Sequence, residues 1–304
     1  LKDITQLDPS TKNIDLSPIL YSDLNNKESN FCKVSKNNPW DKADLSKKIL
    51  SDVKEIINKD KKGTFSYNIS NTDRSVGANV SGEIASRYGE DGLSGSLNLN
   101  FIGSAGQSFG CWNANGLNIT LNGDANDYVG KGMNGGKIII KNDADFAIND
   151  QKTILAGNTC LYGATGGEVY ISGSVGERFA VRNSGAKAVI EGAGDHCCEY
   201  MTGGHVTILG DVGLNFAAGM TGGFAYVLDE NRTFFDKCNR GLVGLERITT
   251  EEMQPHRKHL KEILSNHYKY TNSKKAKEII DDFDKYESHF WLVVPAASNI
   301  QDLL

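Results

Sequence analysis

The sequence predicts a mainly β fold, a single-stranded parallel β-helix (a β-solenoid), with helical caps at both ends. Three observations support this fold class: a repeat of about 20 residues, short apolar runs rich in β-branched residues, and the separation of glycine from proline along the chain. A repeat of this length made of short strands is typical of a solenoid, because each unit buries its apolar face only against its neighbours.

The repeat is defined by the glycine that precedes each apolar run. These glycines are Gly95, Gly116, Gly136, Gly167, Gly185, Gly204 and Gly223, with spacings of 21, 20, 31, 18, 19 and 19 residues. The one long spacing contains the polar stretch 142–152, which is interpreted as an inserted loop. A leucine-rich repeat has a similar period, but its leucine pattern is missing. All of these glycines after Gly95 are predicted to lie at coil corners.

Glycine and proline occupy different parts of the chain. All glycines except Gly63, Gly241 and Gly244 lie between Gly77 and Gly223, and none of the five prolines does. Proline would remove a hydrogen bond from any strand ladder that it entered, whereas glycine permits corners with positive φ. This distribution favours stacked strands joined by tight corners.

The composition divides the chain into three parts. Residues 1–62 are an irregular lead-in and a capping helix, in which apolar residues recur at helical spacing after Asp44. Residues 63–230 form the β-helix, with coils of about 19 residues. Residues 231–304 form a C-terminal helical cap and tail. Because an open solenoid end exposes unpaired strand edges, we expect these flanking elements to cover them.

The C-terminal part contains recognisable helix signals. Thr249 and Glu252 have the spacing of a capping box ahead of one amphipathic helix, and Ser273 is placed to cap a second helix. A final apolar piece, residues 290–294, ends at Pro295.

Bulk properties exclude several classes of protein. A net charge of -5 and a pI near 5.7 give no electrostatic basis for binding nucleic acid or an anionic membrane. No apolar run approaches the roughly 20 residues that span a bilayer. The chain begins without methionine and without a secretory core, so we expect a piece of a longer polypeptide or a processed product. The expected location is the cytoplasm, with an organelle as the alternative. The six cysteines show no C-x-x-C spacing, so a zinc or iron–sulfur site has no local support.

The stretch GKGMNGGKIII contains a G-x-G-x-x-G pattern in Gly130, Gly132 and Gly135. A dinucleotide-binding turn would open a helix at this point, so that helix amides meet the pyrophosphate. The residues that follow, 137–140, are instead of strand type. We therefore interpret this stretch as a repeat corner.

Two polar clusters were considered as metal sites. The run Asp195 to Glu199 combines an acid, a histidine and two cysteines, but adjacent residues of an extended chain point to opposite faces and do not converge on one ion. Asp124, Asn126 and Asp127 lack the ligand spacing of a calcium-binding loop, and turn-closing side chains explain them more simply.

Three histidines of the tail, His256, His259 and His267, lie on one predicted helix. A zinc pair at a spacing of three is conceivable, but no third ligand or general base accompanies it. We expect these histidines to be solvated or half-buried. The sequence predicts no catalytic, cofactor-binding or metal-ligating residue.

The best candidates for an interaction site are Glu177, Arg178, Arg182 and Asn183, in the stretch GERFAVRNSG. They could form a charged patch on one face of the solenoid. Surface ion pairs at a corner are the alternative, and each would contribute little to stability. We favour an interface with a neighbouring domain.

Several motifs resemble the C-terminal, GXGXG-type domain of the glutamate synthase large subunit. They include NTDRSVGANVSGEIASRYG, GDANDYVGKGMNGG, GERFAVRNSGAKAVIEG and NFAAGMTGGFAYVLDE, and the resemblance runs in order from about Asp15 to Leu304. Residues 22–40 match poorly and are interpreted as a lineage-specific insertion. The resemblance implies a right-handed β-helix, in agreement with the repeat.

The resemblance also implies a function. Glutamate synthases convert glutamine and 2-oxoglutarate to two glutamates, using FMN, a 3Fe-4S cluster and NAD(P)H or ferredoxin. The catalytic and cluster cysteines of that family have no matching positions here, so this chain is expected to be noncatalytic and to hold no cofactor. Its implied partners are the amidotransferase and synthase domains of the same polypeptide, and a NAD(P)H-oxidising subunit is a further candidate. The alternative is an independent β-helix protein that binds a small ligand or acts as an enzyme on one solenoid face.

Overall fold

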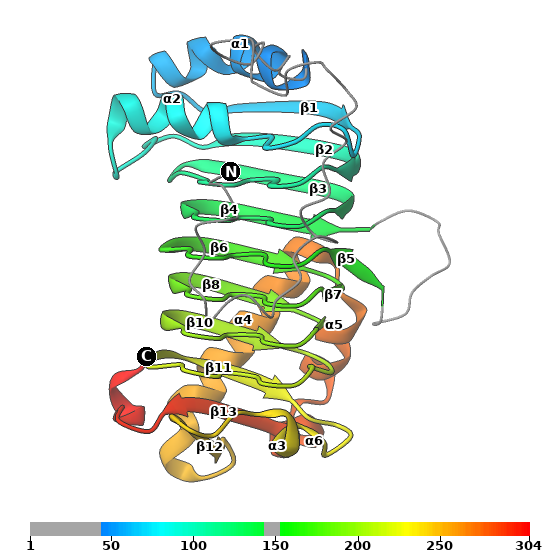
Figure 1. The fold of residues 1–304 in the computed structure, drawn as a ribbon, viewed down its shortest axis with the longest axis vertical. Coiled ribbons are helices and arrows are strands. Elements are labelled where there is room, and N and C mark those ends of the chain that lie inside the picture. Colours follow the sequence, from blue (N-terminus) through cyan, green and yellow to red (C-terminus); the bar gives the residue numbers. More distant parts are fainter. Residues whose placement is uncertain (1–43, 143–152) are drawn as a thin grey trace, which may run out of the picture. The chain divides into compact units, whose positions relative to one another are not determined.

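The computed structural model describes residues 44–142 and 153–304, which contain a long stack of parallel strands (Figure 1). Each strand pairs with the next one of the stack, one coil further along the chain. The strands of this main ladder are β1 (Gly63–Ile69), β2 (Leu97–Ala105), β3 (Leu117–Ala125), β4 (Asn134–Lys141), β6 (Gly166–Ile171), β8 (Ser184–Ile190), β10 (Thr202–Ile208) and β11 (Gly222–Leu228). All seven apolar runs of the repeat are strands, so the predicted parallel solenoid is confirmed.

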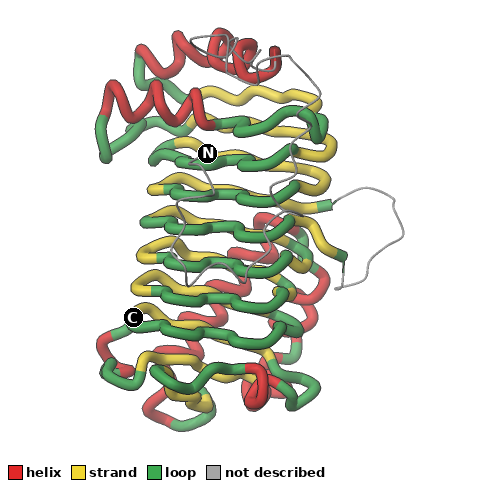
Figure 2. The backbone as a smooth tube through the Cα atoms, viewed as in Figure 1, coloured by secondary structure: helices red, strands yellow, loops and turns green. Residues whose placement is uncertain are grey.

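A second, shorter ladder runs along one side of the stack. It consists of β5 (Ile154–Ala156), β7 (Ser174–Val175) and β9 (Gly192–Ala193), all parallel, and it is joined to β3 by the pairing of Ala125 with Ala156. The coils that contain these short strands therefore have strand segments on two sides and a non-strand segment on a third. Figure 2 shows these non-strand segments as a separate layer that runs alongside the main strands.

The alternation of side chains along each strand places one row of apolar residues inside the coils. Because neighbouring strands are in continuous register at these positions, equivalent residues of successive coils stack directly on one another. This inner row is Leu99, Ile119, Ile138, Val169, Ala188, Val206 and Ala225. All seven are buried in one core cluster, and burial of each large side chain stabilises the fold by about 1.5–3 kcal/mol.

The N-terminal end of the stack is covered by two helices, α1 (Asp44–Asn58) and α2 (Ala78–Tyr88). The helix predicted to follow Asp44 is confirmed as α1, and its residues Ile49, Val53 and Ile57 are buried against the solenoid core. The sequence analysis missed α2.

The other end of the stack is closed by a strand. β13 (Phe290–Pro295), the apolar piece noted in the sequence, pairs antiparallel with β11, and β12 (Val243–Arg247) pairs antiparallel with β13. The last parallel strand therefore has both of its edges paired. A pairing strand satisfies the free backbone groups of this edge directly, which a helix cannot do.

The long helix α4 (Gln254–Thr271) lies across the outer face of the main sheet and contacts β4, β6 and β8. Together with α5 (Lys274–Asp281) it buries outward-facing sheet residues such as Ile139, Tyr170 and Tyr226 in a second core cluster. The smaller helices are α3 (Phe234–Lys237), α6 (Phe283–Tyr286), η3 (Glu251–Met253), η4 (Glu287–His289) and η5 (Ile300–Asp302).

The helix starts differ in part from the prediction. Ser273 caps α5 as expected, since its hydroxyl accepts a hydrogen bond from the Ala276 amide at 3.0 Å. The capping box of Thr249 and Glu252 is wrong, because a 3₁₀ turn precedes α4 and the helix starts at Gln254 without a side-chain cap.

The predicted corner glycines lie just before a strand or within its first three residues. Gly116, Gly136, Gly167, Gly204 and Gly223 have positive φ, but Gly185 does not. Gly185 is required for a steric reason, because a Cβ atom at this position would come within 2.1 Å of the Thr165 carbonyl oxygen. The predicted inserted loop and the poorly matching residues 22–40 lie outside the described residues, apart from Asn142.

Candidate functional site

The non-strand layer of the solenoid has an unusual, repeating backbone. In each of six coils, three residues with left-handed φ alternate with other residues. These triplets are Ser108, Gly110 and Trp112; Tyr128, Gly130 and Gly132; Thr159, Leu161 and Gly163; Arg178, Ala180 and Arg182; His196, Cys198 and Tyr200; and Asn215, Ala217 and Gly219. We refer to the surface formed by these segments as the left-handed face.

Hydrogen bonds between coils hold this backbone in place. In the coil of Tyr128, the first and third amides donate to the following coil, from Tyr128 to Asn158 and from Gly132 to Tyr162. The second amide, of Gly130, donates to Phe109 of the preceding coil, and all three distances are 2.9 Å. Because every amide in the triplet has a partner, the layer satisfies its backbone without forming a β-strand.

This arrangement explains the glycines of GKGMNGG. Gly130 and Gly132 are the second and third left-handed residues of a coil, and Gly136 has left-handed φ within β4. Strand residues follow, and no helix opens there. This stretch therefore belongs to the repeat and leads into a strand, unlike a dinucleotide-binding turn.

The backbone conformation of the left-handed face determines which of its side chains are exposed. The second residue of each triplet is buried, whereas the first and third point outward. Arg178 and Arg182, two of the predicted interface residues, are a first and a third residue and are exposed, as is Glu177 beside them. Asn183 does not belong to this surface. It is fully buried, and its side chain bonds the backbone of Gly185 and Ala186 within the turn.

Acidic and amide side chains at the edge of this face connect successive coils. Asp127 accepts a hydrogen bond from the Asn158 amide at 2.8 Å, and Asn158 accepts one from the Glu177 amide at 2.8 Å. Asp195 does the same for the amide of Leu214 at 2.7 Å. The predicted turn-closing role of Asp127 is therefore more accurately a coil-to-coil link.

The run Asp195 to Glu199 follows the same local pattern. His196 and Cys198 are left-handed rather than extended, so Cys197 and Cys198 both point inward, with sulfurs 3.7 Å apart. His196 pairs instead with Glu199, Nδ1 to Oε1 at 2.7 Å. The predicted alternation of these side chains between opposite faces is therefore wrong, because the backbone here is not extended. Among residues 44–142 and 153–304, no group of three or more His, Cys, Asp or Glu side chains is placed to hold a metal ion.

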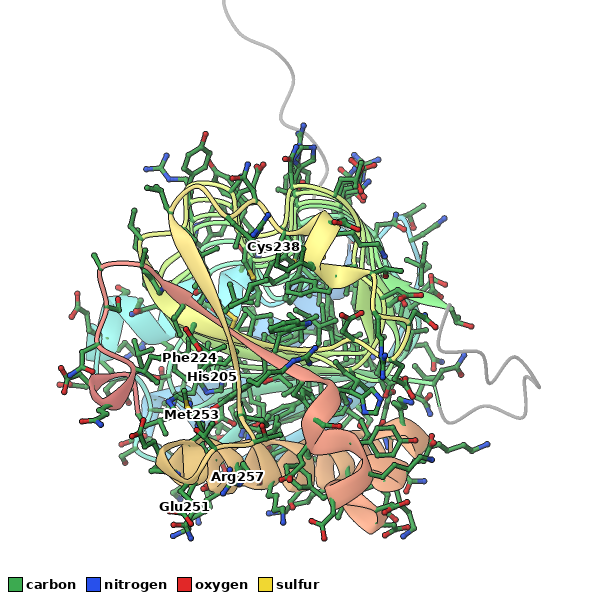
Figure 3. All side chains as sticks on the ribbon, turned by 90° about the horizontal axis from the view of Figure 1, so that it is seen from below. His205, Phe224, Cys238, Glu251, Met253 and Arg257 are labelled. Carbon is green, nitrogen blue, oxygen red and sulfur yellow. The ribbon has the colours of Figure 1, made fainter. Side chains whose placement is uncertain are left out.

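A second candidate feature is a groove between the main sheet and α4. One row of outward-facing residues, in register across five strands, crosses this part of the sheet. The row is Lys137, Glu168, Lys187, His205 and Phe224. Figure 3 shows His205 and Phe224 in the layer between the strands and the helix.

Two adjoining pockets of about 560 and 110 Å³ occupy this groove. Lys187, His205, His259 and Glu262 line both pockets. Lys137 is paired with Glu168 at 2.9 Å, whereas Lys187 has no ion-pair partner among the described residues.

His205 is the most unusual group of the groove. It is 8% exposed, its ring stacks on Phe224 with centroids 5.4 Å apart, and its Nδ1 has no hydrogen-bond partner in the described part of the chain. Burial lowers the pKa of His205 to about 3, with further lowering by the nearby His259 and Lys187. His205 is therefore neutral at pH 7.

Two of the three tail histidines are more buried than predicted, whereas His259 is half-buried as expected. His256 and His267 are 2% and 0% exposed, because α4 packs on the sheet instead of projecting into solvent. His256 Nδ1 lies 2.8 Å from the Tyr226 hydroxyl, and His267 Nε2 lies 3.4 Å from Glu191. Burial lowers the pKa of His256 and of His259.

The sequence analysis did not find His205, Lys187 or Phe224 as site residues. Each lies singly within an alternating strand, where a polar or aromatic side chain gives no local signal. Only the register of β8, β10 and β11 brings them together.

The described unit is a parallel β-solenoid with a repeating left-handed layer, and comparison with known proteins places it in a family. The model of the GXGXG motif family matches residues 44–296, so the chain belongs to this family.

Its relatives include ferredoxin-dependent glutamate synthases. Glutamate synthase 2 of Synechocystis sp. is 47% identical over 244 residues, which are 80% of this chain and 16% of that protein. Glutamate synthase 1 of Arabidopsis thaliana, named chloroplastic/mitochondrial, is 46% identical over 293 residues, 94% of this chain and 18% of that protein. The enzyme of Antithamnion sp. is 44% identical over 297 residues, 97% of this chain and 19% of that protein. The chain thus spans less than a fifth of each of these relatives. No helix within residues 44–142 or 153–304 is long and apolar enough to cross a membrane.

Proposed function

We propose that this chain is an organising module of a ferredoxin-dependent glutamate synthase. The observation that carries the proposal is its similarity, over 80–97% of its own length, to one segment of each of these much longer enzymes. The parent enzyme converts glutamine and 2-oxoglutarate to two glutamates. The names of the relatives favour ferredoxin over NAD(P)H as its electron donor.

In this proposal the module acts through contacts, and the chemistry belongs to other parts of the polypeptide. The five described cysteines are buried as free thiols, and burial raises the pKa of Cys160 to about 12. Such thiols are poor nucleophiles and poor metal ligands. FMN and the 3Fe-4S cluster would be held by the synthase domain, and glutamine would be hydrolysed by the amidotransferase domain. The solenoid would provide a long, rigid surface that fixes the relative positions of the two.

A reconstitution experiment tests this role. The purified chain of 304 residues is mixed with the separately expressed upstream part of the same polypeptide, and reduced ferredoxin, glutamine and 2-oxoglutarate are supplied. The expected result is that adding the chain brings glutamate formation close to two per glutamine hydrolysed. If the upstream part is fully coupled by itself and does not bind the chain, the proposal is wrong.

The groove supports a second candidate function, the binding of a small polar ligand. The specific observation is the buried His205 with an unpartnered Nδ1, beside Lys187 and a pocket of about 560 Å³. A volume in this range is typical of small-molecule sites. Changes in the His205 ring NMR signals on adding candidate metabolites would support binding, and unchanged signals with every candidate would leave the groove without a ligand.

A further inference from the structure

Large side chains occupy positions of the left-handed face where glycine is the favoured residue. The third residue of the triplet is glycine in three coils, at Gly132, Gly163 and Gly219. In the other three coils it is Trp112, Arg182 or Tyr200, with φ of 56°, 56° and 52°. L-residues are disfavoured in this region because Cβ approaches the following carbonyl oxygen.

These side chains do not offset the unfavourable backbone by being buried. Trp112 is 58% exposed and Tyr200 is 61% exposed, and Arg182 is exposed as well. Tyr128, a first residue of its triplet, has positive φ and is also exposed. Strained residues whose side chains remain mostly exposed are a reason to look for a function outside the isolated chain.

The residue types at these exposed positions indicate a protein interface. Trp, Tyr and Arg are the residues most enriched at the energetic centres of protein interfaces. The aromatic rings are also partly held in place, because Trp112 lies against Gly132 and Tyr200 against Gly219 of the next coil. A Cβ atom on these glycines would come within 2.9 Å and 2.6 Å of the respective rings. Rings that are ordered in advance lose less entropy when a partner binds.

We propose that the left-handed face, through Trp112, Arg178, Arg182 and Tyr200, docks against a carboxylate-bearing surface of another domain of the same polypeptide. This inference rests on the proposed function and identifies the face through which the module would contact the rest of the polypeptide.

Two observations support this partner. First, this chain spans only 16–19% of the length of each of these relatives. Most of the polypeptide is therefore available to cover the face. Second, in a chain with a net charge of -5, the guanidinium groups of Arg178 and Arg182 are exposed and form no ion pair with any described residue. A partner's carboxylates would supply the missing bidentate contacts.

The dimensions of the face suit such a partner. Trp112 and Tyr200 lie four coils apart, which corresponds to about 19 Å at the usual spacing of paired strands. A protein interface of standard size covers about 800 Å² on each partner, so one docked domain can contact both residues.

Hydroxyl-radical footprinting tests the location. The 304-residue chain and the whole polypeptide that contains it are oxidised in parallel, and the modification of single residues is measured by mass spectrometry. We expect the oxidation rates of Trp112 and Tyr200 to fall at least fivefold in the whole polypeptide. Tyr268, which is 36% exposed on α4, should change little and is the internal control. Undiminished oxidation of Trp112 and Tyr200 would overturn the proposal.

Glycine substitutions provide a second test, which distinguishes an interface role from a structural role. An interface role predicts weaker binding without loss of thermal stability, whereas a structural role predicts a lower Tm with unchanged binding. The variant W112G/R182G/Y200G of the 304-residue chain should have a Tm equal to or above that of the unmodified chain. Its Kd for the upstream part of the polypeptide should rise at least tenfold. Asn272→Gly, another left-handed residue placed at the end of α4, is the matched control and should leave the Kd unchanged.

The outcomes separate this proposal from the proposed function. If the unmodified chain restores coupling and the triple variant binds equally well, the left-handed face is the wrong surface but the organising role stands. If the triple variant unfolds at lower temperature and binds normally, its side chains are structural. If the unmodified chain neither binds nor affects coupling, the organising role itself fails, while protection of Trp112 in the whole polypeptide would still show docking.

Discussion

The hydroxyl of Tyr226, on the last parallel strand, lies 2.8 Å from Nδ1 of His256 on the long helix. Both side chains are almost fully buried, so this hydrogen bond joins β11 to α4 inside the second core cluster. The same hydroxyl lies 3.3 Å from Nδ1 of His259. One phenol thus connects the sheet to two histidines of the helix that covers it.

The first prediction concerns this contact. Tyr226→Phe keeps the ring but leaves His256 without a partner for a buried nitrogen, and an unsatisfied buried group costs about 1–3 kcal/mol. We expect the free energy of unfolding, measured by urea denaturation, to fall by that amount. Tyr268→Phe, at an exposed position of α4, should change it by less than about 0.5 kcal/mol. Equal effects of the two substitutions would contradict the prediction.

The second prediction concerns pH. The folded-state pKa of His205 is about 3, below the ordinary value of 6.5 that applies to the unfolded chain. Between these values the unfolded state binds more protons, so this contribution to stability is complete above pH 6.5 and is lost progressively as the pH falls toward 3. The slope for one such group reaches about 1.4 kcal/mol per pH unit.

The measurement compares His205→Gln with the unmodified chain in urea denaturation between pH 7.5 and 4.5. The variant should lose less stability over this range, although the lowered pKa values of His256 and His259 keep some pH dependence in both proteins. The charges that face His205 from the sheet and the helix are Lys187 and Glu262. Parallel pH profiles for the two proteins would show that His205 does not contribute.

The third prediction separates two reasons for glycine. Gly163 and Gly204 both have left-handed φ, of 63° and 74°. A Cβ atom at Gly163 would meet no atom within 4 Å, whereas at Gly204 it would lie 2.3 Å from the Ala186 carbonyl oxygen. Gly163→Ala should therefore cost only the backbone term of roughly 1–2 kcal/mol. Gly204→Ala should cost clearly more, or prevent folding, as judged from thermal unfolding and soluble yield.

The fourth prediction concerns the links between coils. Asp195→Ala removes the acceptor of the Leu214 amide and should lower the free energy of unfolding by about 1–2 kcal/mol. Asp195→Asn keeps a side-chain oxygen at the same place and should retain most of this stability. If alanine and asparagine were equally destabilising, the carboxylate charge and not the hydrogen bond would be responsible.

The repeating strands could be predicted from the sequence because their signal is local. A glycine followed by an alternating β-branched run recurs seven times, and proline is absent from the same span. The amphipathic residues of α1 and the Ser273 cap are local signals of the same kind. α2 was missed because its buried residues Val80, Ser81 and Ile84 include a serine, and a glycine interrupts the helix, so the apolar stripe is weak.

The left-handed layer could not be predicted in the same way. Only some of its positions are glycine, and Trp112 or Arg182 gives no indication of positive φ in the sequence. These residues adopt it because hydrogen bonds to the coils on both sides require it, which is a tertiary effect. The groove depends likewise on register between strands and on the packing of α4, so His205 carries no signal until the fold is known.

The closure of the stack by β13 has a consequence for biosynthesis. β11 ends at Leu228, but the strand that pairs with it begins only at Phe290. At a translation rate of about 5–20 residues per second, the last parallel strand leaves the ribosome on the order of 3–12 s before its partner. During this interval its edge is open to strands of neighbouring nascent chains. Ribosomes spaced widely along the message, or a chaperone that covers this edge, would therefore raise the yield of correctly folded protein.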